Sequence, residues 1–540
     1  MDILKSEYLQ IALAFSSALI LFLYATKTLG KEFQELASTK FRNIIVKLVR
    51  NKYSGTLFGT VLTALIQSST AVSVITIMLV NMGIIPFYNS LGIILGSNIG
   101  TTITALLVLV DSTILAPSLM IIGLLLGIIG KKMKIISKPV FHIGFLLFSL
   151  SLLSSTIEPL KSSPVVISLF ANISSPLVAY LVSALFTAII HSSSVTTGII
   201  VVLAQSGLVP IEVAIPMILG ANLGTTFTSL IISAKLNLFA KRVAMADFLF
   251  NFFGTTVFML LLSPFLSTIQ SLSLDPGTQT ALAHLLFNFI TALFFFLFLS
   301  SFEKLIGYIV KGEEEEILLK TKHLKNNFKG KPKKRINNIK MEISYSIEIT
   351  IKLYQKALVL YHSPTSNLEM EIAKYETLND YLDSEITKAI VELSKNKLSP
   401  KNAYSTISLI KISNTIEELG DIGKDLSEVF LRMHKLGISR SEVDIKKLTA
   451  IHNKLIELFQ SIQKNIINTS EKRLLLIKEK EEEISSMIRE QFSKHVLRLQ
   501  QEEKYNGTIF VDAISTIESA VFELRSIRKI MYKQIKEYGN

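Results

Sequence analysis

The sequence contains no cysteine among its 540 residues. This absence excludes disulfide bonds, cysteine-ligated zinc and thiol-based catalysis. It fits a soluble part that faces the cytoplasm, where disulfides are rare. The first residues, MDILKSEYLQ, lack the basic start and the small-residue cleavage site of a secretory signal peptide. We therefore expect a retained first membrane span there.

Charge is almost absent from two long stretches. Asp111 is the only formal charge between Tyr53 and Gly130, and Glu212 is the only one between Ser162 and Ala234. Because a membrane helix needs roughly 20 apolar residues, each stretch predicts several spans. After about residue 303 the chain becomes rich in Lys, Glu, Ile and Leu with helical periodicity. That change predicts a second, soluble domain.

The chemistry of an enzyme or a nucleic-acid-binding protein is also missing. No nucleophile–base pair, phosphate-binding loop or metal-hydrolase spacing is present, so we expect no enzyme. The net charge is +13. Since the basic residues alternate with acids or flank the apolar stretches, this charge does not predict a nucleic-acid partner.

One segment of 38 residues occurs twice. The stretch from Gln67 to Thr104 aligns without a gap with the stretch from His191 to Thr228, at a constant offset of 124, and 14 of the 38 positions are identical. The identities gather at polar, Gly and Pro positions rather than at Leu, Ile and Val. This pattern predicts an internal duplication.

Basic clusters set the expected orientation of the two copies. Clusters at 40–52, 131–138 and 235–242 should all face the cytoplasm by the positive-inside rule. Predicted spans lie at roughly 91–110, 113–129, 140–157, 211–232, 243–264 and 280–300. With this count the segment around 56–80 need not cross and can form a re-entrant hairpin, and the two copies enter from opposite faces. Inverted repeats with broken helices are typical of secondary transporters.

The copies carry two polar motifs at membrane depth. Four polar side chains in a row, as in QSST from Gln67, cover a whole helical turn, so we expect a break or hairpin tip there and at His191–Ser194. A broken helix offers N–H groups for an anion and carbonyls for a cation such as Na⁺. The elements GSNIGTT (from Gly96) and GANLGTT (from Gly220) add glycines for close approach or breakage, an amide and two hydroxyls. An uncharged substrate and plain helix packing remain open alternatives.

Several single residues are weaker candidates. His191 replaces Gln67 in the second copy, as a hydrogen-bonding substitute or a pH-sensitive group. Asp247 follows Lys241 and Arg242, so a local charge pairing is expected. Asn251 and Asn288 lie in the similar contexts FLFNFFG and LLFNFIT, where they could line a cavity or bond between helices.

The motifs QSST…GSNIGTT and HSSS…GANLGTT resemble those of the type II Na⁺/phosphate cotransporter family, its bacterial members in particular. The resemblance covers roughly residues 1–305 and implies Na⁺ as the coupling ion. It assigns phosphate contacts to Ser68, Ser69, Thr70, Ser192, Ser193 and Ser194. It assigns sodium contacts to Gln67, Asn98, Thr101, Thr102, His191, Asn222, Thr225 and Thr226. The family usually has Gln where this chain has His191.

The sequence of the soluble half predicts six helices at roughly 337–361, 367–396, 401–436, 441–469, 471–503 and 508–537. We expect them to form two bundles of three antiparallel helices each. The stretch IEELGDIGKDL resembles the signature of PhoU-like domains, which bind divalent or transition metals. The resemblance implies Glu417, Asp421 and Asp425, which share one helix face, as metal ligands. A solvated acidic face is the competing interpretation, and the linker segment KGKPKKR could touch anionic lipid.

The sequence thus predicts an all-α protein with two domains. Residues 1–305 form a polytopic membrane domain with inverted repeats around 56–130 and 180–264, residues 306–336 a linker, and residues 337–540 a cytoplasmic PhoU-like domain. The expected function is sodium-coupled phosphate transport across the cytoplasmic (inner) membrane by alternating access. A membrane-anchored phosphate sensor or scaffold and a phosphate exporter are the alternatives. Expected partners are inorganic phosphate and lipid, with a homo-oligomer or phosphate-signalling proteins through the soluble domain.

Overall fold

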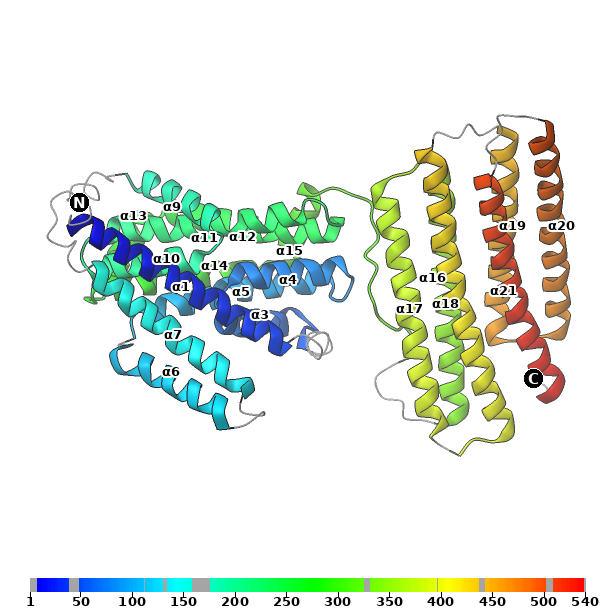
Figure 1. Cartoon of the computed structure of the whole chain (residues 1–540), viewed down its shortest axis with the longest axis horizontal. Helices are drawn as coiled ribbons and strands as arrows, with labels where there is room; N and C mark the ends of the chain where they lie inside the picture. Colours follow the sequence, from blue (N-terminus) through cyan, green and yellow to red (C-terminus); the bar gives the residue numbers. More distant parts are fainter. Residues whose placement is uncertain are drawn as a thin grey trace. The chain divides into compact units, whose positions relative to one another are not determined.

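The structure is a computed structural model of the whole chain. It describes residues 7–37, 48–110, 112–129, 134–157, 175–324, 331–395, 397–436, 442–501 and 508–538. Within these ranges the chain forms nineteen α-helices and no strand, so the all-α prediction is confirmed (Figure 1). Most residues of the first two basic clusters, and Asp111, lie outside the described residues.

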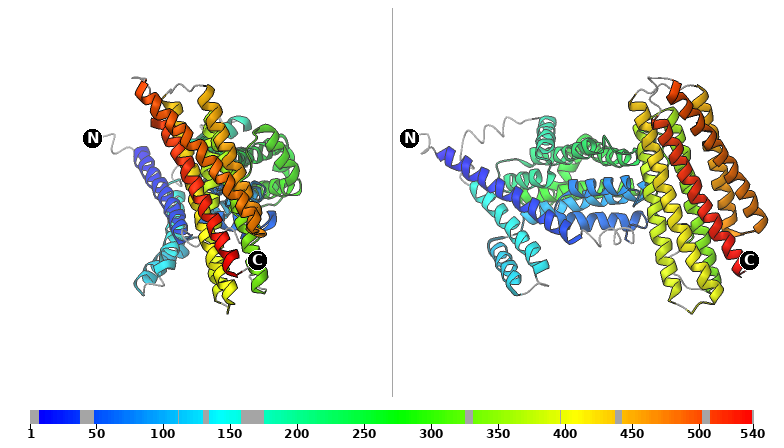
Figure 2. Two further views of the ribbon diagram at one scale, coloured as in Figure 1. Left: turned by 90° about the vertical axis from the view of Figure 1, so that its right-hand side faces the viewer. Right: turned by 45° about the vertical axis from the view of Figure 1, so that its right-hand side comes forward.

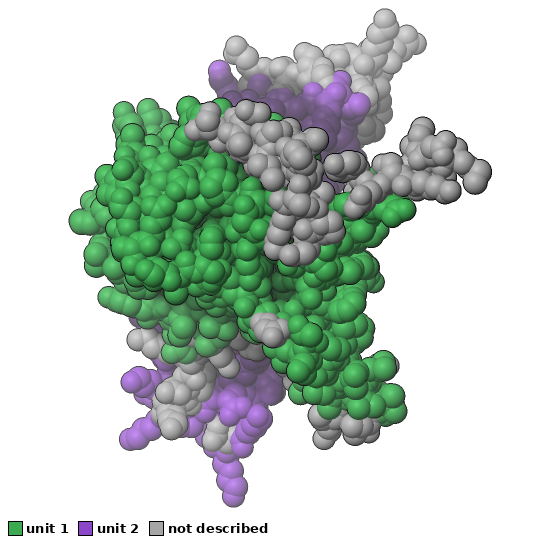
Figure 3. All heavy atoms as spheres, turned by 90° about the vertical axis from the view of Figure 1, so that its left-hand side faces the viewer, with its two compact units in different colours: residues 1–313 green, residues 314–540 purple. Residues whose placement is uncertain are grey.

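The chain divides into two compact units, which Figure 3 shows in different colours. Unit 1 comprises residues 1–313 and unit 2 residues 314–540. Part of the expected linker belongs to unit 2, because the buried carboxylate of Glu342 accepts the backbone N–H groups of Lys322 (2.9 Å) and Leu324 (3.0 Å). A fully buried carboxylate needs such donors, so this contact fastens residues 322–324 to the first helix of the unit.

Unit 1 contains long apolar helices and pairs of shorter ones. Six described helices are long and apolar enough to cross a membrane. Its helices are α1 (Glu7–Ala37), α3 (Lys52–Ile66), α4 (Ser69–Asn81), α5 (Phe87–Val108), α6 (Ser112–Ile129), α7 (Lys134–Ile157), α9 (Pro176–Ile190), α10 (Ser193–Gln205), α11 (Ile211–Ser233), α12 (Leu238–Leu260), α13 (Leu262–Gln270), α14 (Pro276–Leu297) and α15 (Leu299–Ile309).

Two helical hairpins correspond to the two copies of the repeat. They are α3–α4 and α9–α10, and their helices have 13 to 15 residues. Helices of this length are too short to span the hydrocarbon core of a bilayer, which needs roughly 20 residues. The sequence-based expectation that the segment around 56–80 does not cross as one span therefore stays consistent with the observed elements.

The glycines of the second motif let helices pack closely and do not break them. Helix α5 runs unbroken through Gly96, and α11 runs unbroken through Gly220. A Cβ atom on Gly96 would lie 2.0 Å from the carbonyl oxygen of Thr56 in α3, and one on Gly220 would lie 2.0 Å from that of Tyr180 in α9. In both hairpins the first helix therefore packs against the following long helix through the same close backbone-to-backbone contact.

Unit 2 consists of the six predicted helices. They lie side by side (Figures 1 and 2), with α16, α17 and α18 in mutual contact and α19, α20 and α21 likewise. One core of Ile, Leu, Tyr and Phe side chains runs through both trios. The helices are α16 (Pro332–His362), α17 (Ser366–Ser394), α18 (Pro400–Lys435), α19 (Glu442–Ile467), α20 (Glu471–Gln501) and α21 (Thr508–Tyr538).

Candidate functional site

The two hairpins break at equivalent residues. Gln67 ends α3 and His191 ends α9, both in the left-handed region, with φ of 57° and 59°. Ser68 and Ser192 then begin the next helices as N-caps that accept the backbone N–H groups of Ala71 and Val195. Non-glycine residues rarely adopt positive φ, so two such residues at an offset of 124 mark the same built turn.

The tips of the two hairpins contact each other. The hydroxyl of Ser194 donates to the carbonyl oxygen of Gln67 at 3.1 Å, and the hydroxyl of Thr70 donates to that of His191 at 3.4 Å. Thr70 and Ser194 are equivalent in the repeat, as are Gln67 and His191. The contact is therefore reciprocal, which is the signature of a two-fold relationship between the two surfaces.

Gln67 and His191 make the same side-chain contact although their chemistry differs. The hydroxyl of Thr104 donates to Gln67 Oε1 at 2.8 Å, and Thr228 Oγ1 lies 2.8 Å from His191 Nδ1. Thr104 and Thr228 are again separated by 124. His191 thus replaces the amide without loss of the bond to the following long helix.

The Asn-x-Gly-Thr-Thr elements lie on α5 and α11 with matching internal bonds. The side-chain amides of Asn98 and Asn222 donate to the carbonyls four residues earlier. The hydroxyls of Thr101, Thr102, Thr225 and Thr226 also donate to carbonyls of their own helices. All six residues are buried. Because the hydroxyl hydrogens of the four threonines are engaged, only lone pairs of these hydroxyls remain available to a ligand, which suits a cation.

Asp247 lies buried beside the first of these elements. It is 5% exposed, it accepts from the hydroxyl of Ser229 at 3.0 Å, and Ser73 and Asn98 also face its carboxylate. The expected pairing with Lys241 and Arg242 is wrong. Among the described residues no ion pair joins Asp247, and Arg242 donates instead to the carbonyl oxygen of Val310. A buried carboxylate without a basic partner is costly in a membrane and points to a functional role.

Helices α12 and α14 form a second reciprocal pair. Phe250 contacts Phe295 with ring centroids 5.5 Å apart, and Phe258 contacts Phe287 at 5.3 Å. Phe250 is equivalent to Phe287, and Phe258 to Phe295, at an offset of 37 in the FLFNFFG and LLFNFIT contexts. The two helices therefore run antiparallel and exchange the same contacts.

The same offset relates Asp247 to His284. His284 is fully buried, and its Nε2 lies 3.5 Å from Asn222 Oδ1 in the second copy of the motif. Asn251 and Asn288 each donate their amide to the carbonyl one turn earlier in their own helix, at Asp247 and His284. The amide nitrogens of Asn251 and Asn288 therefore bond within their own helices and not between helices.

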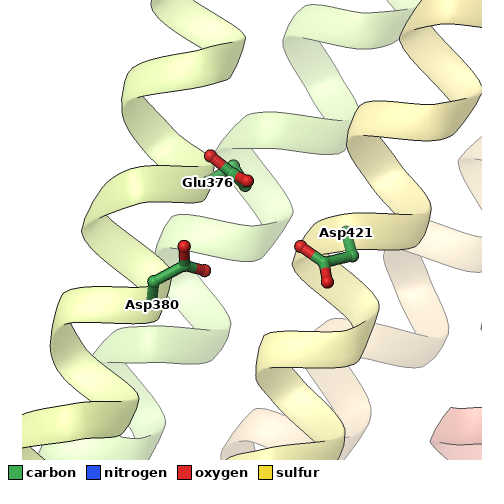
Figure 4. Close-up of side chains that lie close together, drawn as sticks. All are labelled: Glu376, Asp380 and Asp421. Atoms are coloured by element: carbon green, nitrogen blue, oxygen red, sulfur yellow. The ribbon is translucent and has the colours of Figure 1, made fainter.

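Unit 2 brings three carboxylates together. Glu376, Asp380 and Asp421 have carboxylate oxygens within 4.8 Å of one another, and Figure 4 shows them on two neighbouring helices. Burial, followed by repulsion from Glu376, raises the pKa of Asp380 to about 6. Lys424 donates to Glu376 at 2.9 Å. Of the metal ligands implied by resemblance, only Asp421 is in this group, while Glu417 and Asp425 are not, so the metal site stays a prediction.

The structure thus gathers most sequence-predicted residues of unit 1 around the two hairpin tips. Sequence reasoning did not single out His284, and it assigned Asp247 to a local charge pairing. A signal was present, because both stand four residues before the matched asparagines, but the charges beside Asp247 favoured a different interpretation.

Broken hairpins with meeting polar tips, set among long apolar helices, are the features of secondary transporters. Comparison with known proteins gives the particular family. The Na⁺/Pi-cotransporter family matches this chain twice, over residues 21–155 and 152–274. Each match contains one copy of the repeat, so residues 21–274 of this chain match that family.

Individual relatives extend the comparison. "Uncharacterized protein YqeW" of Bacillus subtilis is 29% identical over 273 residues, 50% of this chain and 89% of its own. "Putative inorganic phosphate export protein YjbB" of Salmonella typhimurium is 22% identical over 82% of both chains, a length that includes residues of unit 2. The human "Sodium-dependent phosphate transport protein 2B" is 36% identical over 104 residues, 18% of this chain and 15% of its own.

Proposed function

We propose that this protein transports inorganic phosphate across the cytoplasmic membrane together with Na⁺, with both bound between the tips of the two hairpins. The observation that carries the proposal is the reciprocal contact of Ser194 with Gln67 and of Thr70 with His191. In this contact the broken ends of two helical hairpins meet at one point.

Phosphate is matched by the starts of α4 and α10. The first N–H groups of an α-helix have no partner within the helix, and the helix dipole makes this end positive. Ser69 and Ser193 add hydroxyl donors in the same first turns, while the hydroxyls of Thr70 and Ser194 join the two tips. No Lys or Arg lies in either hairpin region between Tyr53 and Gly130 or between Ser162 and Ala234. The anion therefore depends on helix ends and on a bound cation for positive charge.

Na⁺ is matched by oxygen atoms that lack a basic neighbour. The hydroxyls of Thr101 and Thr225 retain their lone pairs, and the ends of α3 and α9 present carbonyls. When ionised, Asp247 supplies a negative charge beside Asn98. A buried carboxylate that meets only neutral donors is stabilised by a coupled cation, and the cation in turn attracts the anion.

Alternating access between inverted repeats is supported by the antiparallel pair α12 and α14. A two-fold axis that exchanges two antiparallel helices is perpendicular to their length. If these helices span the bilayer, the axis lies in the membrane plane, which is the symmetry of inverted-repeat transporters. We propose that the two hairpins exchange roles around this axis during transport, with unit 2 as a cytoplasmic regulatory, PhoU-like domain.

Export is the second candidate for the direction of transport. The relatives that align over 82% of both chains carry the name of an inorganic phosphate export protein, while the human relative is named for sodium-dependent phosphate transport. The family resemblance therefore supports phosphate as cargo and leaves both directions for experiment.

The test is a flux assay on the full chain in proteoliposomes, with labelled phosphate and a Na⁺ gradient imposed in either direction. Phosphate should accumulate on the side toward which Na⁺ flows, because the two ions share one site. Phosphate flux without any response to Na⁺ would remove the coupling. Binding of phosphate without flux would favour the sensor instead.

A double variant and a control variant test the site in the same assay. Ser69→Ala with Ser193→Ala should lower flux by about tenfold or more, because two donors are removed from the bound anion. Ser155→Ala is the matched control, since this exposed serine bonds only to the carbonyl of Leu152 in α7. Equal flux in both variants would show that the tips do not bind phosphate.

A further inference from the structure

A basic cavity opens at one end of the helical bundle in unit 2. Its volume is about 600 Å³, and its described walls come from four helices, α16, α18, α19 and α21, and from Asn468 and Thr469 between α19 and α20. Three lysines line it, namely Lys333, Lys340 and Lys401, and no Asp or Glu is among the described lining residues. A concave site of this size is in the range that holds small molecules.

Placing the lysines together in this cavity is electrostatically unfavourable. Burial and the nearby charge of Lys401 lower the pKa of Lys340. Among the described residues no ion pair joins Lys333 or Lys340 to a carboxylate. Helices α16 and α18 begin at this cavity while α19 and α21 end there, so their dipoles partly cancel and the lysines determine its positive sign. A bound anion would offset the repulsion among the lysines of this cavity.

Neutral donors complete the cavity wall. Gln534 Nε2 donates to the hydroxyl oxygen of the buried Ser405 at 3.3 Å, which leaves the hydroxyl hydrogen of Ser405 to donate elsewhere. Asn402 and Asn468 add side-chain amides. Ammonium, amide and hydroxyl donors together suit phosphoryl oxygens, which accept several hydrogen bonds each.

We propose that this cavity binds a soluble anion with several phosphoryl groups and no aromatic base. The cavity is much larger than a single phosphate ion, and three ammonium groups match more than one phosphoryl group. No aromatic side chain is among its described lining residues, so nothing there stacks on a nucleobase. Unit 2 thereby has an anion site that is separate from the hairpin tips and does not depend on phosphate being the cargo.

The test uses the purified full chain in an uncharged detergent, with sodium tripolyphosphate as the probe and inorganic phosphate and sulfate as comparisons. Calorimetry should give tighter binding for tripolyphosphate than for either single anion, and the affinity should fall with rising salt. The bound probe should also protect Lys333, Lys340 and Lys401 from acylation, as read by mass spectrometry. Absence of binding at millimolar probe, or protection of other lysines only, overturns the proposal.

A matched pair of variants separates this site from general charge. Lys340→Gln with Lys401→Gln should weaken tripolyphosphate binding by about tenfold or more, because both partners of the repelling pair are removed. Lys388→Gln with Lys478→Gln removes the same charge from two exposed lysines that pair with Glu385 and Glu482. This control should retain the affinity within about twofold.

Equal losses in the two double variants would overturn the site. If Lys340→Gln with Lys401→Gln lowers thermal stability before any probe is added, Lys340→Gln alone provides the binding measurement, and an unchanged affinity for tripolyphosphate in that variant overturns the proposal. Protection of the same lysines by short-chain phosphatidylglycerol in place of tripolyphosphate would assign the site to a lipid headgroup and overturn the soluble ligand.

Discussion

At the scale of single residues, the exchange of Gln67 for His191 between the two copies is the most informative difference. Both residues end a helix in the left-handed region and both bond to the equivalent threonine, Thr104 or Thr228. The position therefore requires a side chain that reaches a hydroxyl, and either an amide or an imidazole satisfies this requirement.

This equivalence gives the first prediction. His191→Gln should retain phosphate flux within about threefold, because glutamine makes this contact at Gln67. His191→Leu should lower flux by about tenfold or more, since it leaves the tip without its bond to Thr228. Flux measured in proteoliposomes at saturating Na⁺ distinguishes the two. If both variants behave alike, the bond to Thr228 is not what the position requires.

At the scale of helices, the close packing of each hairpin against its long helix should limit which residues can replace the glycines at the contact. Gly96→Ala places a Cβ atom 2.0 Å from the carbonyl oxygen of Thr56, a distance that backbone atoms cannot tolerate. We expect α3 and α5 to separate, with a loss of about 3 kcal/mol or more of stability. Thermal unfolding of the purified chain in detergent measures this loss.

Gly307→Ala is the control for that substitution. Gly307 lies in α15, and a Cβ atom there would meet nothing within 4 Å. Alanine is a better helix former than glycine by about 1 kcal/mol, so the variant should be as stable as the parent chain or slightly more stable. A similar loss in both variants would mean that the close contact at Gly96 is not the cause.

The acidic group on α17 and α18 predicts a pH dependence of unit 2. The pKa of Asp380 is raised in the folded chain to about 6, above its unfolded value of about 3.9. The folded state thus favours the protonated acid, and this contribution to stability is present below the unfolded pKa and lost as pH rises through the folded pKa. Because Asp380 is only partly buried and water screens its charge, we expect a loss of about 1 kcal/mol in stability between pH 4 and pH 7.

Asp380→Asn should remove most of that dependence, since the amide does not titrate. Hydrogen exchange of the α17 amides across the same pH range provides the measurement. The charged groups that remain, Glu376, Asp421 and Lys424, set the residual slope. An unchanged slope in the variant would assign the pH dependence to another group. A divalent cation that binds the three carboxylates would reverse its sign, because it favours the charged form.

Much of the helical arrangement could be predicted from sequence because its signals are local. The breaks at Gln67 and His191 follow from polar runs at membrane depth, and the six helices of unit 2 follow from their periodicity and turn residues. The partners of Asp247 could not be predicted in this way. The hydrogen-bond partners of Asp247 come from α4, α5 and α11. Its neighbours in sequence favoured a pairing with Arg242, which bonds elsewhere.

At the scale of the whole molecule, two offsets describe one symmetry. The offset of 124 relates the hairpins and the long helices that follow them, whereas the offset of 37 relates α12 to α14. Both produce reciprocal contacts, at the tips and at the phenylalanines of α12 and α14. Asp247 faces Asn98 of the first copy while His284 faces Asn222 of the second. The two halves are therefore alike in backbone and differ in the titratable side chain beside this asparagine, a carboxyl group in one half and an imidazole in the other.

The division into two units predicts that transport resides in unit 1 alone. The Bacillus relative aligns over 273 residues that make up 89% of its own length, so it is too short to contain counterparts of both units. Each unit here has its own buried clusters of apolar side chains. A chain that ends after Glu313 should therefore insert, remain monodisperse in detergent and carry phosphate at a rate within about threefold of the full chain, because the proposed site lies wholly in unit 1. Flux in proteoliposomes at equal protein content measures this rate. A truncated chain that is monodisperse but inactive would mean that unit 2 takes part in the transport cycle itself and is more than its regulator.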